Sequence, residues 1–141
     1  MTKEDIKKII PHREPFLFID EIIELTPLHK ATGVKYISED EYYFKGHFPE
    51  APVMPGVIII ESLAQVGAIT LLSHPDYTGK LAYFTGIKNA KFRRSVLPGD
   101  KLILTCELTK IRGNFGFGKA QAFVDDQLVC ETEISFAIGN L

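Results

Sequence analysis

The sequence predicts an α+β fold in which an antiparallel sheet packs against one buried helix. Residues 57–72 form an apolar run without proline, and a helix that is hydrophobic on nearly all sides is typically buried. Residues 101–112, 115–124 and 128–138 alternate apolar with polar side chains and are joined by short turns, which indicates an antiparallel meander. One buried helix and such a sheet favour the α+β class. We expect a single domain over residues 1–141, because this length suffices for a hydrophobic core.

The N-terminal third is predicted to contain a short helix and three strands. Thr2 and Asp5 resemble a capping arrangement, so we expect a helix from Lys3 to Ile10 that ends at Pro11. Strands are expected at residues 16–25, 29–37 and 42–45, and the last of these leads into Gly46 and His47.

The central helix is predicted to follow a proline-rich segment. Prolines fix φ and remove backbone donors, so residues 47–55 cannot be helical. Pro55 and Gly56 mark the helix start, and the sixteen residues from Val57 to Leu72 give a helix of about 24 Å. Beyond this helix we expect a loop at residues 73–79, a strand at 81–87 broken by Gly86, and a second short strand or bend at 90–96.

The alternating strands also predict which side chains face the core. Gly113-Asn114 and Asp125-Asp126 are expected to form the turns between them. One face of the sheet should therefore carry Leu102, Leu104, Cys106 and Leu108, together with Leu128, Cys130, Thr132, Ile134, Phe136 and Ile138.

The net charge of −2 is small, but the charges are unevenly distributed. Residues 77–119 contain nine Lys/Arg and only two acidic residues, and this stretch could steer an acidic partner or simply form a solvated strand face. Nucleic acid is not the expected partner, because the sequence has no dense basic run and no recognition motif.

The two cysteines and four histidines lack the spacing of a metal site, so we predict no metal. Cys106 and Cys130 are typical of a reduced cytoplasmic protein with buried thiols. The N-terminus lacks an apolar signal core, and the apolar run at 57–72 is short for a membrane span and carries Glu61. We therefore expect a cytoplasmic protein without membrane insertion.

The candidate site centres on His47, Gly56 and Glu61. Histidine is a base near neutral pH, a carboxyl in an apolar helix tends to stay protonated, and the first N–H groups of a helix can bind a developing oxyanion. Together these groups can remove a proton from carbon and protonate a leaving oxygen. The residues alone leave another interpretation open, in which His47 is a solvated loop residue and Glu61 faces solvent or an ion-pair partner.

The stretch at residues 46–65, GHFPEAPVMPGVIIIESLAQ, resembles the signature of the bacterial FabZ-type β-hydroxyacyl-acyl-carrier-protein dehydratases. The opening at residues 10–20 and the segments at 82–94 and 96–100 resemble the same family, so the resemblance covers essentially the whole chain. It implies a hot-dog fold, in which a curved antiparallel β-sheet wraps around one long central helix.

The resemblance also implies a reaction. (3R)-Hydroxyacyl-acyl carrier protein would lose water to give trans-2-enoyl-acyl carrier protein in type II fatty acid biosynthesis. His47 would be the base, Glu61 the acid and the Gly56 N–H the oxyanion donor. The protein would need no cofactor of its own, because the substrate arrives on the phosphopantetheine of acyl carrier protein.

Family members use these residues across a homodimer and commonly assemble as a trimer of dimers, so the resemblance implies that His47 of one chain meets Glu61 of another. Gln65 is expected to hydrogen-bond Glu61 or a water, and Tyr83 matches a mobile tyrosine that gates the substrate tunnel. His12 is interpreted as structural or as lining the entrance. The expected tunnel residues are Phe48, Val53, Pro55, Val57, Gln65 and Tyr83, and the expected carrier-docking residues are Lys88, Lys91, Arg93, Arg94 and Lys119.

Three other functions are compatible with this kind of fold. A thioesterase would need an acid placed to activate water, for which the pairing of His47 with Glu61 is less suited. A FabA-type dehydratase that also isomerises the double bond carries aspartate where Glu61 stands here. A non-catalytic acyl-thioester sensor would usually carry a DNA-binding segment.

Overall fold

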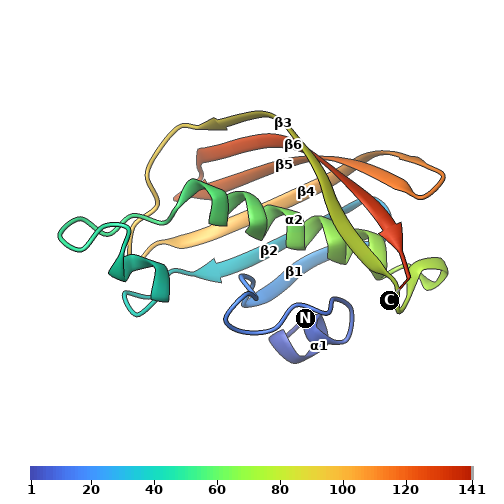
Figure 1. Ribbon diagram of the computed structural model, residues 1–141, viewed down its shortest axis with the longest axis horizontal. Coiled ribbons are helices and arrows are strands. Elements are labelled where there is room, and N and C mark those ends of the chain that lie inside the picture. Colours follow the sequence, from blue (N-terminus) through green and yellow to red (C-terminus); the bar gives the residue numbers. More distant parts are fainter. Residues whose placement is uncertain (141) are drawn as a thin grey trace.

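The computed structural model describes residues 1–140, which form one six-stranded antiparallel sheet and one long helix (Figure 1). The strand order is β1-β2-β4-β5-β6-β3. The strands are β1 (Glu21–Thr26), β2 (Lys30–Tyr36), β3 (Leu81–Phe92), β4 (Lys101–Arg112), β5 (Phe115–Val124) and β6 (Gln127–Gly139). The helices are α1 (Lys3–Lys7) and α2 (Gly56–Leu72), with 3₁₀ helices η1 (Tyr42–Lys45) and η2 (Pro75–Tyr77).

Helix α2 lies along the inner face of the sheet and contacts strands β2 to β6. Five strands can contact one helix only if the sheet curves around it. Figure 1 shows β3, the strand at one edge of the sheet, crossing beside α2. From Ser62 to Leu72 every residue of the helix is buried. This arrangement confirms the predicted α+β class and the curved sheet around one helix of the hot-dog fold.

The meander has the predicted strands and turns. Leu102, Leu104 and Cys106 of β4 are fully buried, because alternate residues of this strand point toward α2. The turn between β5 and β6 places Asp125 at φ 50° and Asp126 at φ 63°. Two consecutive left-handed residues are typical of the type I′ turn, whose twist matches that of the flanking strands.

Four predicted elements were wrong in extent or type. The N-terminal helix ends at Lys7 rather than Ile10, since the N–H groups of Lys8 and Ile9 donate to carbonyls three residues back and tighten the chain into a turn. Residues 42–45 form a 3₁₀ helix rather than a strand, since Tyr43 and Phe44 are both buried and consecutive strand residues would face opposite sides. Strand β1 begins at Glu21, because the backbone of residues 16–18 bonds to a side chain of α2. Strand β3 runs unbroken to Phe92, since bulges between Phe84/Gly86 and Lys88/Lys91 absorb the irregularity.

The centre of α2 depends on a glycine. A Cβ added at Gly67 would lie 2.7 Å from Cζ of Phe136 and 3.1 Å from Sγ of Cys106, so the sheet can approach the helix only because that atom is absent. Gly67→Ala is expected to lower the free energy of unfolding by about 1–3 kcal/mol through overpacking, measured by urea denaturation.

Gly46→Ala is the matched control for this substitution. An added Cβ at Gly46 meets nothing within 4 Å, and the backbone there has φ −113°, which alanine adopts readily. The control should change the free energy of unfolding by less than about 0.5 kcal/mol. Equal losses in both variants would show that close helix–sheet packing does not limit position 67.

Candidate active site

His47 lies in the loop between η1 and α2, and its ring orientation is fixed by a backbone carbonyl. Its Nδ1 is 2.8 Å from the carbonyl oxygen of Val53, while the Val53 N–H donates back to the His47 carbonyl at 3.0 Å. A carbonyl oxygen can only accept, so Nδ1 carries the hydrogen in the neutral ring. Nε2 is therefore the nitrogen that is available to accept a proton.

Gly56, the first residue of α2, lines the same cavity of about 660 Å³ as His47. The first N–H groups of a helix have no acceptor within the helix, and the N-cap residue Pro55 has no side-chain acceptor to offer them. A Cβ at Gly56 would lie 2.7 Å from the ring of Phe92. Glycine thus allows Phe92 to cover the helix start and keeps the N–H open to an oxyanion.

Glu61 lies further along α2, with its side chain mostly buried against the N-terminal segment. Burial raises the pKa of its carboxyl above the ordinary value, and the hydrogen bond from Gln65 offsets only part of this shift. That bond runs from Nε2 of Gln65 to Oε2 of Glu61 at 3.0 Å, as expected from the sequence. A raised pKa keeps more of the carboxyl protonated, which suits a general acid.

The side-chain amide of Gln65 is held in a single orientation. Its oxygen accepts a hydrogen bond from the Phe18 N–H at 2.9 Å, and its nitrogen donates to the Phe16 carbonyl at 3.0 Å. If the amide were flipped, its oxygen would face the Phe16 carbonyl oxygen and its NH₂ group would face the Phe18 N–H. Gln65 must therefore present a hydrogen-bond donor to Glu61.

Within one chain, His47 and Glu61 occupy different surroundings. His47 shares its cavity with the start of α2 and the end of β3, whereas Glu61 contacts Gln65 and the segment that carries His12. The two residues that the sequence pairs by chemistry therefore do not share a cavity within one chain.

The expected tunnel residues fall into three groups. Val53, Pro55 and Val57 line the cavity with His47, and the ring of Phe48 stacks on the His47 ring with centroids 4.0 Å apart. Gln65 is buried beneath Glu61 instead of lining this cavity. Tyr83 is half-exposed on β3, opposite Ala137, near the other end of α2.

The expected carrier-docking residues also separate. Arg93 and Arg94 line the His47 cavity, and Arg93 forms an ion pair with Glu131 at 2.9 Å. Lys91 lies opposite Glu131 in the pairing of β3 with β6.

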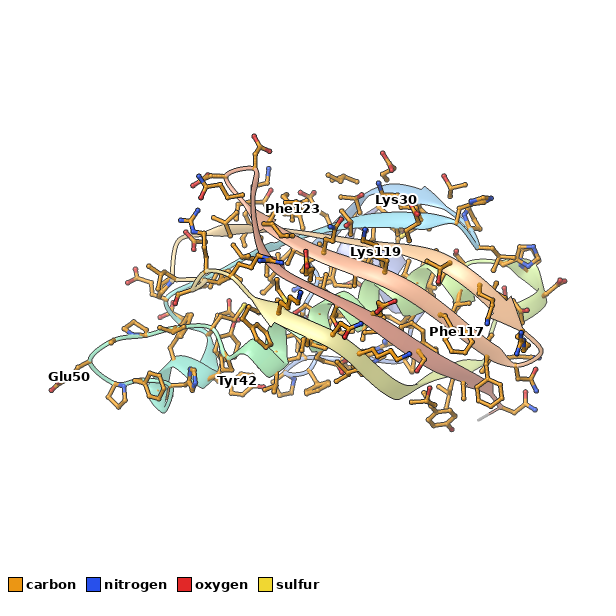
Figure 2. The ribbon with its side chains drawn as sticks, turned by 90° about the horizontal axis from the view of Figure 1, so that it is seen from above. Lys30, Tyr42, Glu50, Phe117, Lys119 and Phe123 are labelled. Atoms are coloured by element: carbon orange, nitrogen blue, oxygen red, sulfur yellow. The ribbon has the colours of Figure 1, made fainter. Side chains whose placement is uncertain are left out.

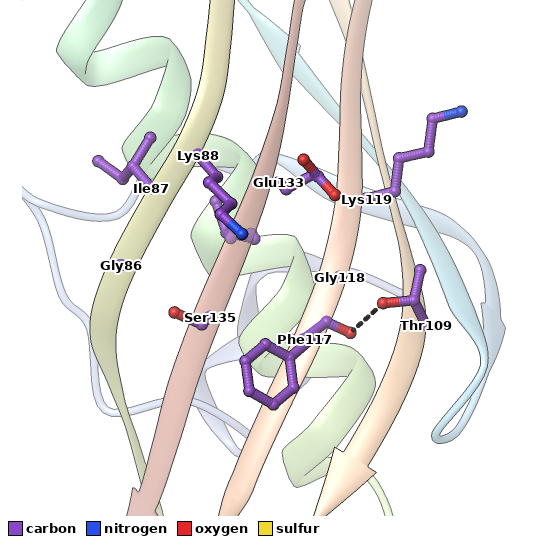
Figure 3. Close-up of a pocket in the computed structure, with 10 residues that line it drawn as sticks. Gly86, Ile87, Lys88, Thr109, Phe117, Gly118, Lys119, Glu133 and Ser135 are labelled. Carbon is purple, nitrogen blue, oxygen red and sulfur yellow. Dashed lines mark hydrogen bonds between the residues drawn. The ribbon is translucent and has the colours of Figure 1, made fainter.

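Lys88 and Lys119 belong to a different surface. They line a shallow groove of about 370 Å³ on the outer face of the sheet, together with Phe117 and Glu133 (Figure 3). Figure 2 shows Phe117 and Lys119 along β5 on this outer face. The groove lies across the sheet from α2, and these two lysines do not line the His47 cavity.

Sequence reasoning missed one residue of the site and one contact. The missed residue is Phe92, which covers Gly56 from the end of β3. The missed contact is that of His12, named only as structural or as lining the entrance, whose Nε2 lies 3.8 Å from Oε2 of Glu61. Neither contact has a signal in sequence spacing, because each joins segments that only the fold brings together.

A family model described as a FabA-like domain matches residues 10–133. The chain is 58% identical over 136 residues to the 3-hydroxyacyl-[acyl-carrier-protein] dehydratase FabZ of Clostridium botulinum (strain Loch Maree / Type A3), which covers 96% of this chain and 94% of that protein. The chain belongs to the FabA-like family, FabZ type. The FabZ of Bacillus cereus (strain AH820) is 51% identical, with 97% of this chain and 95% of that protein covered.

A solved structure shows the same fold at low sequence identity. The dehydratase heterocomplex ApeI:P from Xenorhabdus doucetiae matches with a TM-score of 0.77 at 16% identity, covering 96% of this chain and 91% of that chain. Within residues 1–140, no helix combines the length and the hydrophobicity needed to cross a membrane.

The raised pKa of Glu61 predicts a pH-dependent stability difference. A carboxyl whose pKa is higher in the folded state binds protons more tightly there, so its contribution to stability is present at low pH and is lost as pH rises through the raised pKa. Glu61→Gln stays neutral at every pH. The free energy of unfolding of the variant relative to wild type should therefore increase from about pH 4.5 to about pH 8.

Urea denaturation at both pH values measures this difference. Glu50→Gln is the control, since Glu50 lies exposed at the tip of the loop before α2 (Figure 2) and its carboxyl carries no burial cost. A difference for Glu61→Gln that does not change with pH would contradict the assignment of a burial-raised pKa.

Proposed function

We propose that the protein dehydrates (3R)-hydroxyacyl-acyl carrier protein to trans-2-enoyl-acyl carrier protein in type II fatty acid biosynthesis. The observation that carries the proposal is the fixed His47 tautomer, with Nδ1 bound to the Val53 carbonyl, in one cavity with the open N-terminus of α2 at Gly56. Membership of the FabZ type supports the same reaction.

In the first step, Nε2 of His47 takes the proton from C2 of the acyl chain. The electron pair of the C–H bond moves toward the thioester, whose carbonyl oxygen gains negative charge. The Gly56 N–H and the positive end of the helix dipole stabilise that oxygen in the proposed transition state.

In the second step, protonated Glu61 gives its proton to the C3 hydroxyl. The C3–O bond breaks, water leaves, and the electron pair at C2 forms the C2=C3 double bond. His47 is then protonated and Glu61 is a carboxylate, so transfer of one proton between them restores the starting state. The burial-raised pKa of Glu61 favours the protonated form that this step requires.

The proposed catalytic pair comes from two subunits of a homodimer, which would assemble further as a trimer of dimers. Three features of the chain support this. His47 and Glu61 lie in separate surroundings within one chain, and β3 is a terminal strand of the sheet. Exposed apolar side chains also gather along β3 and at the start of α2, namely Val57, Tyr83, Ile87 and Phe92.

The substrate would arrive on the phosphopantetheine arm of acyl carrier protein, so the reaction would need no cofactor of the enzyme's own. Arg93 and Arg94 at the His47 cavity are the proposed contacts for this acidic partner, with Lys88, Lys91 and Lys119 as a second basic group. The proposed location is the cytoplasm, which agrees with the free, buried thiols of Cys106 and Cys130.

The reaction is tested by enoyl formation from a 3-hydroxyacyl-acyl carrier protein. Loss of a general base or acid typically costs about 10²–10⁴-fold in rate, so His47→Ala and Glu61→Gln should each lower kcat/KM by that order. Product analysis by mass spectrometry separates enoyl thioester from free acid and from a shifted alkene.

Circular dichroism and thermal unfolding establish that both variants fold. Free acid from the wild type would replace the dehydratase proposal with a thioesterase, and absence of any product would favour an acyl-thioester sensor. Near-normal activity of Glu61→Gln would leave the reaction intact and remove Glu61 as its acid.

Carrier docking is tested by reversing single charges. Arg94→Glu should weaken binding of acyl carrier protein by about tenfold at low salt, and the effect should shrink as salt screens the charges. Arg94 is a cleaner choice than Arg93, because reversal of Arg93 would set two carboxylates together at Glu131.

Lys119→Glu tests the second basic group, on the outer face of the sheet. Surface plasmon resonance over a salt series compares the two variants. A larger loss for Lys119→Glu than for Arg94→Glu would move the docking surface to the outer groove.

A further inference from the structure

His12 lies next to the proposed acid, although the mechanism above does not use it. It belongs to the segment between α1 and β1, which Figure 1 shows beside β1. Its Nε2 is 3.8 Å from Oε2 of Glu61, and the side chains of both residues are mostly buried, at 24% and 20% exposed. A movement of about 0.8 Å would bring this pair within hydrogen-bond distance.

Arg13 fixes the position of the His12 backbone. Its guanidinium donates to three carbonyls, that of Lys7 at the end of α1 at 3.0 Å and those of Ile10 at 3.0 Å and His12 itself at 2.7 Å in the segment that follows. These charge-assisted bonds tie the segment to the end of α1. The imidazole of His12 is therefore presented to α2 by an anchored segment.

The surroundings of His12 keep its ring neutral. Among the residues that the structure describes, its buried Nδ1 has no hydrogen-bond partner. A protonated ring would place an unsatisfied N–H there, which is costly in a buried position. Burial, and then the positive charge of Arg13, lower the pKa of His12 accordingly. The neutral ring that fits carries its hydrogen on Nε2, toward Glu61.

Two donors thus converge on one oxygen of Glu61. Gln65 must donate to Oε2, because its amide is locked by Phe16 and Phe18, and Nε2 of His12 approaches the same atom. An oxygen that faces two donors acts as an acceptor.

We propose that His12 is a positioning residue that, together with Gln65, holds Oε2 of Glu61 as an acceptor and so assigns the acidic proton to Oε1. The inference rests on the proposed function and specifies which oxygen delivers the proton. Within its own chain, Glu61 is faced by Gln65 on the same helix and by His12, with Arg13 behind it, from the N-terminal segment. A neutral donor orients the acid without the charge that would lower its pKa strongly.

A matched pair of variants tests this proposal. His12→Gln keeps a neutral N–H donor at similar reach. His12→Met introduces a side chain of nearly the same shape as glutamine that has no donor. The pKa of Glu61 is measured by ¹³C NMR of labelled carboxyl groups without substrate, its signal being identified by its loss in Glu61→Gln. Kinetics of enoyl formation give kcat and KM for each variant.

We expect His12→Met to raise the pKa of Glu61 by about half a pH unit or more, because a donor that stabilises the carboxylate is gone. Its kcat should fall about tenfold, with KM within about twofold of wild type, because the proton is then free to reside on either oxygen. His12→Gln should restore both values to near those of wild type. If the role of His12 were purely structural, His12→Met would lower the stability of the protein. It would not combine a higher pKa of Glu61 with a lower kcat.

Two results would overturn the proposal. One is an unchanged pKa and kcat in His12→Met, and the other is equal loss in both variants, which would point to a charged imidazole. The carboxyl titration separates this inference from the proposed function. If wild type makes no enoyl product but only His12→Met shifts the pKa, the contact stands and the dehydratase assignment fails.

Discussion

The hydrogen bonds of the Gln65 side chain are the interaction on which the candidate site depends. A buried amide is costly unless its donors and acceptor are used, and here Phe16, Phe18 and Glu61 use them. The same bonds tie the N-terminal segment to the central helix. Glu61 on that helix and His12 in that segment thereby hold a fixed relation, although they come from distant parts of the chain.

The polar groups of α2 are tolerated because the rest of the helix is so well buried. Leu63, Val66 and Ile69 are fully buried in the hydrophobic core, and burial of such a side chain contributes about 1.5–3 kcal/mol. The helix can therefore carry a carboxyl whose burial disfavours its charged form. The feature that makes Glu61 an apt acid also makes it a local cost to stability above its pKa.

One helix supplies both electrostatic devices of the proposed reaction. Its open N-terminus at Gly56 faces the His47 cavity, and its flank presents Glu61 to the N-terminal segment. The backbone carbonyl of Val53 fixes the tautomer of His47 directly. The backbone acts on Glu61 indirectly, because it orients the side-chain amide of Gln65, which in turn donates to the Glu61 carboxyl. Such fixed orientation is the general requirement for acid–base catalysis without large reorganisation.

The sequence by itself determined the elements whose signals are local. The start of α2 followed from Pro55 and Gly56, and the meander followed from strict alternation and the Asp125-Asp126 turn. Only the tertiary structure decided that residues 42–45 are a 3₁₀ helix, that β1 begins at Glu21, and that His12 faces Glu61. The reason is physical: these features depend on contacts such as that of Phe16 with Gln65, 49 residues apart, which no local periodicity encodes.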